Sequence, residues 1–582
     1  MHDTEPVAPM TTENADQDYY TTQRGRRIEK NPIPYWQCNT VQDVKTILAR
    51  DVPEPETVRE ALSGTYAEHW RAAMHKEFKS LIKNGTWRKE NLPPNKNAIQ
   101  SKWIFKVKPK PDGSIEKFKC RLVCKGFTQR HGSDYLETFA PVAKMTSIRL
   151  LFSIAAQHKM KISHFDFETA FLNGWLEEEL YMRLPQEAAA LIQLSIPDYQ
   201  TEPVRLLKSL YGLKQAGRCW NRELDKHLHS IGFSPLKADP CIYTRINNEN
   251  DKIYIGVYVD DCLVVSSNSQ ASDELFKALK SKYSVKDLGR PSQFLGMEIN
   301  YKEDGSIHLR QKRYIGDLLK KYDFETLKPS KTPYISGQKL ESNPTQDGKP
   351  EQLSDKPYAE LVGSLNWLAN SCRPDISKIT GQLCRFTSRP HKSHWKAAVQ
   401  VLRFLKGTQD QGIHMKCNET KNYLYGYSDS DWAGDYTRRS TSGYCFNYGG
   451  GLISWRSKLQ KSIALSSAEA EYMAVCFAAR EAVWLRRLLY ELGFSQEDRP
   501  TKIFEDNSGC RSLSENWRAD QRTKHIEVQY HFTREQVEAN RIHLAEIGTE
   551  NMIADGFTKS LPAPRFKWFQ EALGLTSLTG SH

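Results

Sequence analysis

Residues 253–266 read IYIGVYVDDCLVVS, two apolar runs rich in β-branched residues on either side of Asp260 and Asp261. Runs of this composition predict two neighbouring strands buried in a sheet. Ionised carboxylates beside a buried sheet are costly unless a cation compensates them, and two adjacent ones repel each other. The stretch therefore predicts either a cation site between two strands or a surface turn, where Asp is common.

A second acid occupies a matching position upstream. Residues 161–174 read KISHFDFETAFLNG, in which Ile162, Phe165 and Phe167 mark an apolar strand with Asp166 at its end. Two acidic strand ends in one chain favour the cation site over the surface turn.

These segments resemble the reverse transcriptase of copia-type LTR-retrotransposon Pol polyproteins. The resemblance rests on ordered motifs: FD (165–166), TAFLNG (169–174), LYGLKQA (210–216), YVDD (258–261) and FLGMEI (294–299). It covers roughly residues 65–330, continues weakly through 355–410 and resumes strongly from 422. One departure is visible, because the family usually has Pro after KQA and this chain has Gly217.

The resemblance implies an α+β multidomain protein that begins with a right-hand polymerase of fingers, palm and thumb. It implies that Asp166 and Asp260 are metal ligands for two Mg²⁺ ions, or Mn²⁺ in their place, with Asp261 as the weaker candidate. Such an enzyme joins the 3′-hydroxyl of a DNA primer to a dNTP on an RNA template. Phe171 matches the family's steric gate against a 2′-hydroxyl, and core packing is the alternative role for this ring.

Residues 101–130 form the most basic stretch of the chain, with nine Lys or Arg residues against Asp112 and Glu116. Apolar and basic residues alternate on both sides of a Pro-Asp-Gly turn, which predicts a β-hairpin with one cationic face. This face suits phosphate, and a solvated strand surface is the plain alternative. The resemblance places four of its cations at the incoming triphosphate: Lys106, Lys108, Lys119 and Arg121. A register slip of one residue would change which pair reaches it.

The LYGLKQA motif supplies the remaining nucleotide-binding candidates. By resemblance, Tyr211, Gly212 and Gln215 lie along the templating base and the nucleotide pocket. Gly217, where the family has Pro, removes no chemical group and leaves the loop less constrained.

A second acidic pattern fills the C-terminal part of the chain. From Asn422 the sequence predicts three strands, with a glycine turn at 449–451 between the second and the third. A helix follows that begins with the capping box Ser466-x-x-Glu469. Next come an apolar strand with an acid at its end, TKIFEDNSG (501–509), and a last acid in NMIADGFTKSL (551–561).

This order of elements and acids is the pattern of ribonuclease H, and the segments resemble the copia-type version. The matching residues are Asp429, Glu471, Asp506 and Asp555. Glu471 is preferred to Glu469 because the two differ by about 200° around a helix, and Asp429 is preferred to Asp431. Each acid alone has an ordinary explanation as a turn, surface or capping residue. Together they imply a two-metal site that cleaves RNA in an RNA–DNA hybrid.

Composition excludes several other classes. The chain has 582 residues and a formal charge of 82 − 70 = +12, and its 39% hydrophobic content excludes wholesale disorder. It lacks a run of ~18 uncharged apolar residues, so we expect no membrane span. Its acidic beginning lacks a secretory pattern. The absence of any C-x-x-C pair predicts reduced thiols rather than a zinc site or a disulfide framework.

We expect five segments along the chain. These are a loosely attached or disordered arm (1–60), fingers and palm (61–330), a linker with a helical thumb or connection (331–421), the ribonuclease H domain (422–562) and a tail (563–582).

The predicted function is that of an RNA-directed DNA polymerase with ribonuclease H activity. The expected partners are RNA template, DNA primer, RNA–DNA hybrid and dNTPs, with self-association left open and no membrane. Relatives act in cytoplasmic virus-like particles and then deliver DNA to the nucleus. Because no protease or integrase motif is found, we expect a part of a longer Pol polyprotein or a polymerase–nuclease part alone. The alternative is a catalytically silent, retrotransposon-derived protein that binds nucleic acid, and the role of His525 is also open.

Overall fold

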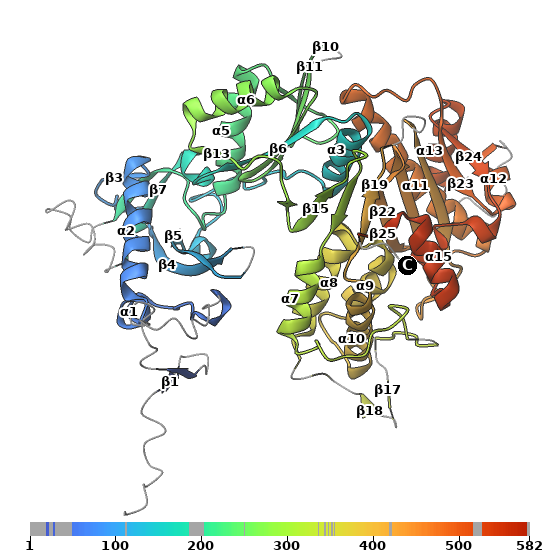
Figure 1. Ribbon diagram of the computed structural model, residues 1–582, viewed down its shortest axis with the longest axis horizontal. Coiled ribbons are helices and arrows are strands. Elements are labelled where there is room, and N and C mark those ends of the chain that lie inside the picture. The colour runs from blue at the N-terminus through green and yellow to red at the C-terminus, as the bar shows by residue number, and fades with distance from the viewer. Residues whose placement is uncertain are drawn as a thin grey trace, which may run out of the picture. The chain divides into compact units, whose positions relative to one another are not determined.

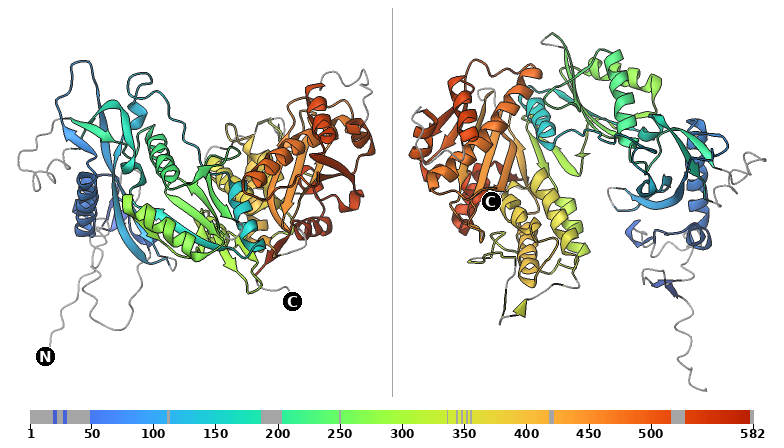
Figure 2. Two further views of the ribbon diagram at one scale, coloured as in Figure 1. Left: turned by 90° about the horizontal axis from the view of Figure 1, so that it is seen from above. Right: turned by 180° about the vertical axis from the view of Figure 1, so that it is seen from behind.

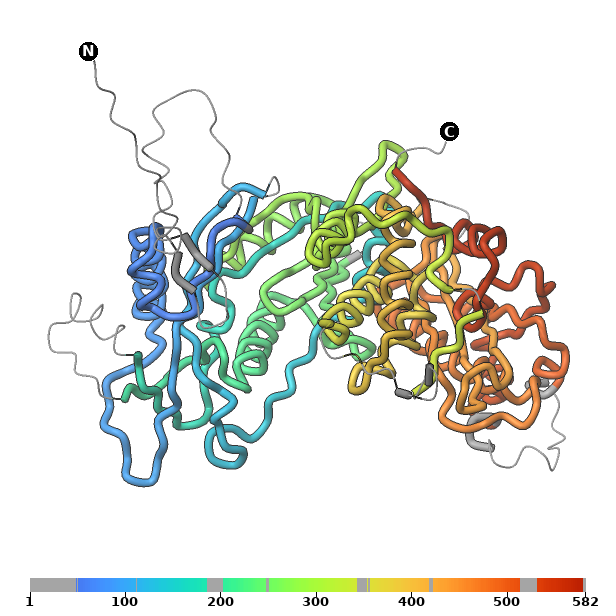
Figure 3. Tube along the Cα trace, turned by 90° about the horizontal axis from the view of Figure 1, so that it is seen from below, coloured from blue at the N-terminus to red at the C-terminus, as the bar shows by residue number. Residues whose placement is uncertain are grey.

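The structure is a computed structural model that describes most of the chain. The described residues are 19–21, 27–29, 49–110, 113–185, 203–248, 251–335, 337–342, 345–346, 349–350, 353, 356–417, 422–515 and 527–578 (Figures 1 and 3). The chain forms two compact units, which are described separately. Unit 1 comprises residues 1–140 and 169–227, and unit 2 comprises residues 141–168 and 228–582. Among the described helices, none has the length and apolar character that crossing a bilayer requires.

Unit 1 is built on a five-stranded sheet of order β3-β8-β7-β4-β5. Its strands are β3 (Trp87–Lys89), β4 (Ala98–Pro109), β5 (Ile115–Cys124), β7 (Trp175–Arg183) and β8 (Val204–Lys208), and its helices are α1 (Val58–Ser63), α2 (Ala67–Lys83) and α5 (Ala216–Ser230), the last of which continues into unit 2. The short helical turns η2 (Ala49–Asp51), η3 (Gly126–Thr128) and η4 (Ala170–Asn173) and a small β1–β2 pair (Tyr19–Thr21, Arg27–Glu29) complete it.

Helix α2 covers the core face of the β4–β5 hairpin (Figure 1). Its buried side chains recur at three- and four-residue steps, which is the spacing of one helix face. Trp70 contacts Phe105 and Phe118 edge-on, with ring centroids 5.4 and 4.7 Å apart. Glu77 lies on this buried face too, although the apolar pattern did not mark it.

The β4–β5 pair is the hairpin that the alternating sequence predicts. Trp103, Phe105 and Val107 are buried, and the residues between them are more exposed. The register places Lys106 opposite Lys119. The cationic hairpin face therefore carries Lys102, Lys106, Lys108, Lys117, Lys119 and Arg121. The turn residues 111–112 lie outside the described part.

The first sheet of unit 2 has the order β13-β6-β12-β11-β10-β9. Its strands are β6 (Lys161–Phe167), β9 (Ser234–Pro235), β10 (Ile242–Asn248), β11 (Asp251–Tyr258), β12 (Asp261–Ser266) and β13 (Val285–Asp287), and its helices are α3 (Met145–Gln157) and α6 (Ser269–Lys282). Helix α3 packs against β11 so closely that a Cβ on Gly256 would lie 2.8 Å from Ile148 Cδ1. The apolar runs around Asp260 are thus the two buried strands that their composition predicts.

A second sheet of order β14-β15-β16-β19-β25 and a group of helices follow. Its strands are β14 (Gln293–Phe294), β15 (Met297–Tyr301), β16 (Ile307–Arg310), β19 (Gln411–Met415) and β25 (Leu575–Ser577). The helices are α7 (Lys312–Lys321), α8 (Tyr358–Ser371), α9 (Ser377–Cys384) and α10 (Lys392–Gly407). A short β17–β18 pair (Thr345–Gln346, Lys349–Pro350) and the turn η5 (Pro374–Ile376) lie between α7 and α9 in the sequence. Strand β25 from the C-terminal segment pairs with β19, so this segment contributes to the sheet.

The third sheet has the order β22-β21-β20-β23-β24, with β20, β23 and β24 parallel and β21 and β22 antiparallel. Its strands are β20 (Leu424–Ser430), β21 (Thr441–Tyr448), β22 (Gly451–Leu459), β23 (Thr501–Glu505) and β24 (Ile542–Glu546), and its helices are α11 (Ser467–Glu491), α12 (Ser508–Glu515), α13 (Glu527–Glu538), α14 (Asp555–Thr558) and α15 (Ala563–Ala572), with the turn η7 (Thr549–Asn551).

Helix α11 packs against β20 and β21 of this sheet (Figures 1 and 2). As predicted, Ser466 caps its first turn, and the Ser466 hydroxyl accepts from the backbone N–H of Glu469 at 3.2 Å. The helix ends at Glu491, and Gly493 follows with a φ of +79°.

Candidate active sites

The first acidic cluster, Asp166, Asp260 and Asp261, lies at one end of the first sheet of unit 2. Asp261 begins β12 directly opposite Asp166 on β6. The backbone N–H of Phe167 donates to the carbonyl of Asp260 at 2.9 Å, which fixes the β11–β12 turn against β6. Sheet pairing thus brings together acids that are far apart in the sequence.

The turn that carries Asp260 has an unusual backbone. Val259 adopts a φ of +59°, a left-handed conformation that β-branched residues rarely take. Non-glycine residues held in this region cost about 1–3 kcal/mol and concentrate at functional sites. The tight turn places Asp260 between the two strand ends.

Two residues, Cys262 and His164, lie next to the first acidic cluster. Burial raises the pKa of Cys262 well above its ordinary value, and the charges of Asp261, Asp260 and Asp166 raise it further. His164, which the sequence interpretation missed, lies two residues before Asp166, and its Nε2 is 2.8 Å from Asp261 Oδ1. The period-two spacing on one strand is the signal that would have placed it on the same face as Asp166.

In unit 1, some of the predicted nucleotide-binding residues form a row. The Arg121 guanidinium lies 4.3 Å from the centroid of the Tyr211 ring, and that ring contacts Phe171 edge-on at 5.4 Å. Gly212 has a φ of +90°, and a Cβ there would lie 2.1 Å from the carbonyl oxygen of Cys124. Only glycine fits between these two segments.

The other predicted nucleotide-binding residues are placed differently. Lys106 pairs with Glu54, and Lys108 lies exposed opposite Lys117. Burial lowers the pKa of Lys119, and Arg121, Lys108 and Lys117 lower it further. Gln215 is 1% exposed, and its amide donates to the Asp134 carbonyl at 2.9 Å and accepts from Gln129 at 3.0 Å. These bonds hold the 129–135 segment against the start of α5.

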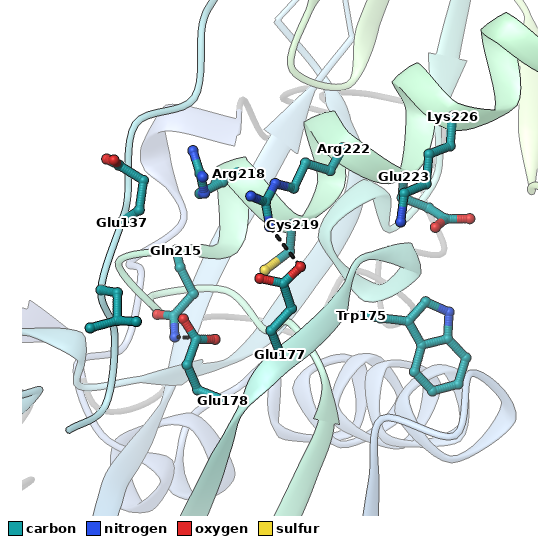
Figure 4. A pocket seen from close by; sticks show the side chains of 11 residues that line it. Glu137, Trp175, Glu177, Glu178, Gln215, Arg218, Cys219, Arg222, Glu223 and Lys226 are labelled. Carbon is teal, nitrogen blue, oxygen red and sulfur yellow. Dashed lines mark hydrogen bonds and ion pairs between the residues drawn. The ribbon is translucent and has the colours of Figure 1, made fainter. Parts of the chain in front are cut away.

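A pocket of about 530 Å³ lies in unit 1 beside α5 (Figure 4). Its charged side chains are mixed in sign, with four Glu residues against Arg218, Arg222 and Lys226. Arg222 is paired with Glu177 at 2.7 Å. The pocket thus lacks the positive excess that phosphate binding favours.

The second acidic cluster lies at one end of the third sheet. Asp429, Glu471 and Asp506 each offer a carboxylate oxygen, and these three oxygens lie within 4.8 Å of one another. They come from the end of β20, the second turn of α11 and the position after β23. Among the described residues, no other group of three Asp, Glu, His or Cys side chains brings its ligand atoms within 4.8 Å of one another. The three acids of the first acidic cluster therefore do not all lie within this distance of one another.

Asp555, the fourth predicted acid, is held by two cations. Lys559 Nζ lies 2.5 Å from Asp555 Oδ1 and 3.1 Å from Asp429 Oδ1. Arg565 Nη2 lies 3.5 Å from Asp555 Oδ2. Glu469 and Asp431, which the sequence interpretation ranked below Glu471 and Asp429, make local hydrogen bonds. Glu469 accepts from the backbone N–H of Leu465, and Asp431 accepts from that of Thr441. His525 lies outside the described residues.

Unpartnered carboxyl oxygens mark the buried side of the second acidic cluster. Glu471 Oε2 and Glu505 Oε2 are buried and have no hydrogen-bond partner. Burial raises the pKa of Glu471, and the nearby Asp429 and Glu505 raise it further. Burial also raises the pKa of Asp429, although Lys559 opposes the shift. The Asp429 and Asp506 carboxylates accept from Thr558 and Thr549, so the unpartnered oxygen of the three is Glu471 Oε2, and a hard divalent cation fits beside it.

Lys559 and Glu505 were not among the predicted site residues. Both lie near predicted acids in the sequence. Lys559 follows Asp555 by four residues, and Glu505 directly precedes Asp506. Nothing in their local pattern separates them from ordinary surface charges, so only their burial and contacts identify them.

Comparison with known proteins identifies the class of protein to which this chain is similar. Residues 84–336 match the family described as "Reverse transcriptase (RNA-dependent DNA polymerase)". The chain is 38% identical over 554 residues to the "Retrovirus-related Pol polyprotein from transposon TNT 1-94" of Nicotiana tabacum, covering 94% of this chain and 41% of that relative.

The chain belongs to the copia-type retrotransposon Pol family. A "Putative transposon Ty5-1 protein YCL074W" of Saccharomyces cerevisiae is 33% identical over 311 residues, which are 97% of that relative and 53% of this chain. The chain spans only about two fifths of the length of the TNT 1-94 polyprotein. A foamy viral protease–reverse transcriptase structure with double-stranded DNA aligns with a TM-score of 0.43 at 12% identity, covering 82% of this chain and 70% of that one.

Proposed function

We propose that this chain is an RNA-directed DNA polymerase whose nucleotidyl-transfer site is the first acidic cluster. The observation that carries this proposal is the pairing of β6 with β12, which sets Asp166 opposite Asp261 beside Asp260. Membership of the copia-type family supports it. The substrates would be an RNA template, a DNA primer and dNTPs.

The chain's own residues would divide the work of this reaction. Asp166 and Asp260 would hold Mg²⁺, and Asp261, oriented by His164, would complete the negative field. Bound Mg²⁺ would stabilise the charge that develops on the attacking and leaving oxygens. The cationic hairpin face would bind phosphate, and the Phe171–Tyr211–Arg121 row offers ring surfaces against a sugar or base.

We also propose that the second acidic cluster cleaves the RNA strand of RNA–DNA hybrids. The observation that carries this proposal is the set of three carboxylate oxygens within 4.8 Å, together with the unpartnered Glu471 Oε2. Asp429, Glu471 and Asp506 would hold a divalent ion, and Asp555 would complete the acid set. Hybrid recognition would depend on groove shape and 2′-hydroxyl contacts rather than on base identity.

Primer extension on poly(rA)/oligo(dT) with Mg²⁺ tests the polymerase proposal. We expect Asp260→Asn to abolish incorporation, because it removes a charged ligand. The matched control is Asp317→Asn, which changes an exposed acid on α7 and should leave incorporation unchanged. Equal incorporation by the wild type and Asp260→Asn would refute the polymerase proposal.

Cleavage of a labelled RNA–DNA hybrid tests the nuclease proposal independently. Asp506→Asn should abolish cleavage and spare primer extension, whereas Asp260→Asn should do the reverse. A catalytically silent protein, the alternative function, would show neither activity in the wild type. All seven predicted acids are present in the chain, which favours the active protein.

A further inference from the structure

The four acids of the second acidic cluster are not equivalent. Three of them point carboxylate oxygens at one another, and the fourth, Asp555, is outside that group. Asp429 belongs to both arrangements, because it lies in the group of three and also contacts Lys559. The site therefore has two edges, one formed by Asp429 and Asp555 and the other by Glu471 and Glu505, and the compensation of carboxylate charge differs between them.

On the Asp555 edge, the chain supplies its own cation. Lys559 Nζ bridges Asp429 Oδ1 and Asp555 Oδ1 at 3.1 and 2.5 Å. The Asp429 side chain is fully buried, whereas the Lys559 side chain is 42% exposed. The ammonium thus reaches the buried carboxylate from the solvent side, and a lysine side chain is long and flexible enough to leave.

On the Glu471 edge, compensation is incomplete among the described residues, because Glu505 Oε1 accepts from the backbone N–H of Asn507 at 3.2 Å but its Oε2 has no partner. Glu471 is 8% exposed and Glu505 is 0% exposed, and one oxygen of each lacks a hydrogen-bond partner. Buried, unpartnered carboxylate oxygens are strongly unfavourable unless a cation binds them. An added ion would meet unpartnered oxygens at this edge, whereas Lys559 already compensates the other edge.

We propose that Lys559 is a resident cation that occupies the Asp429–Asp555 edge and competes there with a divalent ion. One ion would bind Asp429, Glu471 and Asp506 with Lys559 in place. A second ion would bind only when the ammonium leaves, so the two binding events would differ in affinity. This inference rests on the proposed nuclease function and specifies the regulation of that site.

Removing the ammonium should strengthen the second binding event. Lys559→Met removes the ammonium that bridges Asp429 and Asp555 and leaves only Arg565, whose Nη2 lies 3.5 Å from Asp555 Oδ2, so a divalent ion meets less competition there. Mutating a residue that supports metal ligands costs about 10–100-fold in metal affinity. Because Lys559 opposes the ion instead of supporting it, we expect its removal to change affinity in the other direction, with a gain of at least about tenfold.

Counting bound Mn²⁺ by electron paramagnetic resonance, with Mn²⁺ alone and the full chain, tests this proposal. The first acidic cluster is common to all variants, so differences report on the second. The matched control is Lys567→Met on α15, which removes an exposed lysine that pairs with Glu571. Lys559→Gln serves as a second neutral variant, and Lys559→Arg retains the charge.

The expected result is a second, about tenfold tighter Mn²⁺ in Lys559→Met and Lys559→Gln, with wild-type binding in Lys559→Arg and Lys567→Met. Unchanged binding in both neutral variants would overturn the proposal, as would equal tightening in Lys559→Arg. Asp506→Asn separates the two levels of inference. If it removes no bound Mn²⁺ from the wild type, the nuclease site itself is wrong and this proposal is overturned with it.

Discussion

Gly212 shows how one residue determines a local arrangement in unit 1. Its φ is +90°, and the position that a Cβ would take lies 2.1 Å from the carbonyl oxygen of Cys124. The N–H of Cys124 also donates to the carbonyl of the adjacent Tyr211 at 2.8 Å. The close approach positions Tyr211 beside Arg121 and Phe171.

We predict that Gly212→Ala lowers the stability of unit 1 by at least about 2 kcal/mol, because both the backbone conformation and the space exclude a methyl group. Gly132→Ala is the matched control, since Gly132 has a φ of +83° with no atom within 4 Å of its Cβ position. It should cost only about 1 kcal/mol. Thermal unfolding followed by circular dichroism measures both, and equal losses would contradict the steric argument.

Val259 carries a different kind of constraint, in the turn of the first acidic cluster. Glycine tolerates its φ of +59°, whereas alanine does not. We predict that Val259→Gly is more stable than Val259→Ala by about 1 kcal/mol. Both variants remove the valine side chain, so differential scanning calorimetry of the pair isolates the backbone strain. An alanine variant as stable as the glycine variant would show that the turn is unstrained.

At the scale of elements, helix α2 and the cationic hairpin illustrate an unexpected contact. The buried face of α2 includes Glu77, whose Oε1 has no hydrogen-bond partner. Burial raises the pKa of Glu77 to about 7, although Arg121 and Lys119 oppose the shift. A buried carboxyl group thus lies under two residues expected to bind phosphate.

This contact predicts a pH dependence for unit 1. The folded state binds a proton on Glu77 more tightly than the unfolded state, so stability falls as the pH rises from 4.5 to about 7. Glu77→Gln should therefore stabilise unit 1 by about 2 kcal/mol more at pH 8 than at pH 4.5. Melting temperatures at both pH values measure this effect. Glu68→Gln, an exposed acid on the same helix, is the control and should show no such difference.

At the scale of the whole molecule, unit 2 combines three sheets around shared buried contacts. Arg149 on α3 is 3% exposed, and its guanidinium donates to the carbonyls of Ile453, Asn370 and Ser371 at 2.8, 2.6 and 3.0 Å. It also stacks on Trp455 at 3.9 Å. Burial lowers the pKa of Arg149 to about 9. One side chain thus joins α3, α8 and β22.

We predict that Arg149→Met lowers the stability of unit 2 by about 3 kcal/mol, because it leaves buried carbonyls without donors. Since β22 belongs to the sheet of the second acidic cluster, hybrid cleavage should fall as well, although Arg149 lies outside the cluster in sequence. Arg290→Met, which removes an exposed arginine stacked on Tyr301 at 3.5 Å, is the control. Unaltered melting and cleavage in Arg149→Met would contradict this role.

Local sequence pattern predicts much of this protein. The period-two hairpin at 101–124, the capped helix that begins after Ser466 and the strands around Asp260 all follow from side-chain spacing. These features need only neighbouring residues, because hydrophobic periodicity and capping act within one element. The family motifs likewise identify the acids, although their roles remain proposals.

Tertiary structure alone decided the rest. It set the register that puts Lys106 opposite Lys119, buried Glu77 and Glu505, and brought His164 to Asp261 and Lys559 to Asp429. Each of these contacts joins residues whose proximity cannot be read from the spacing of residues within one helix or strand. The desolvation and the charge pairing of these residues arise only when the helices and strands pack together. The sequence by itself determined which acids this protein has and on which elements they lie. Only the folded chain decided which of them gather their carboxylate oxygens within 4.8 Å and which one pairs with Lys559 and Arg565.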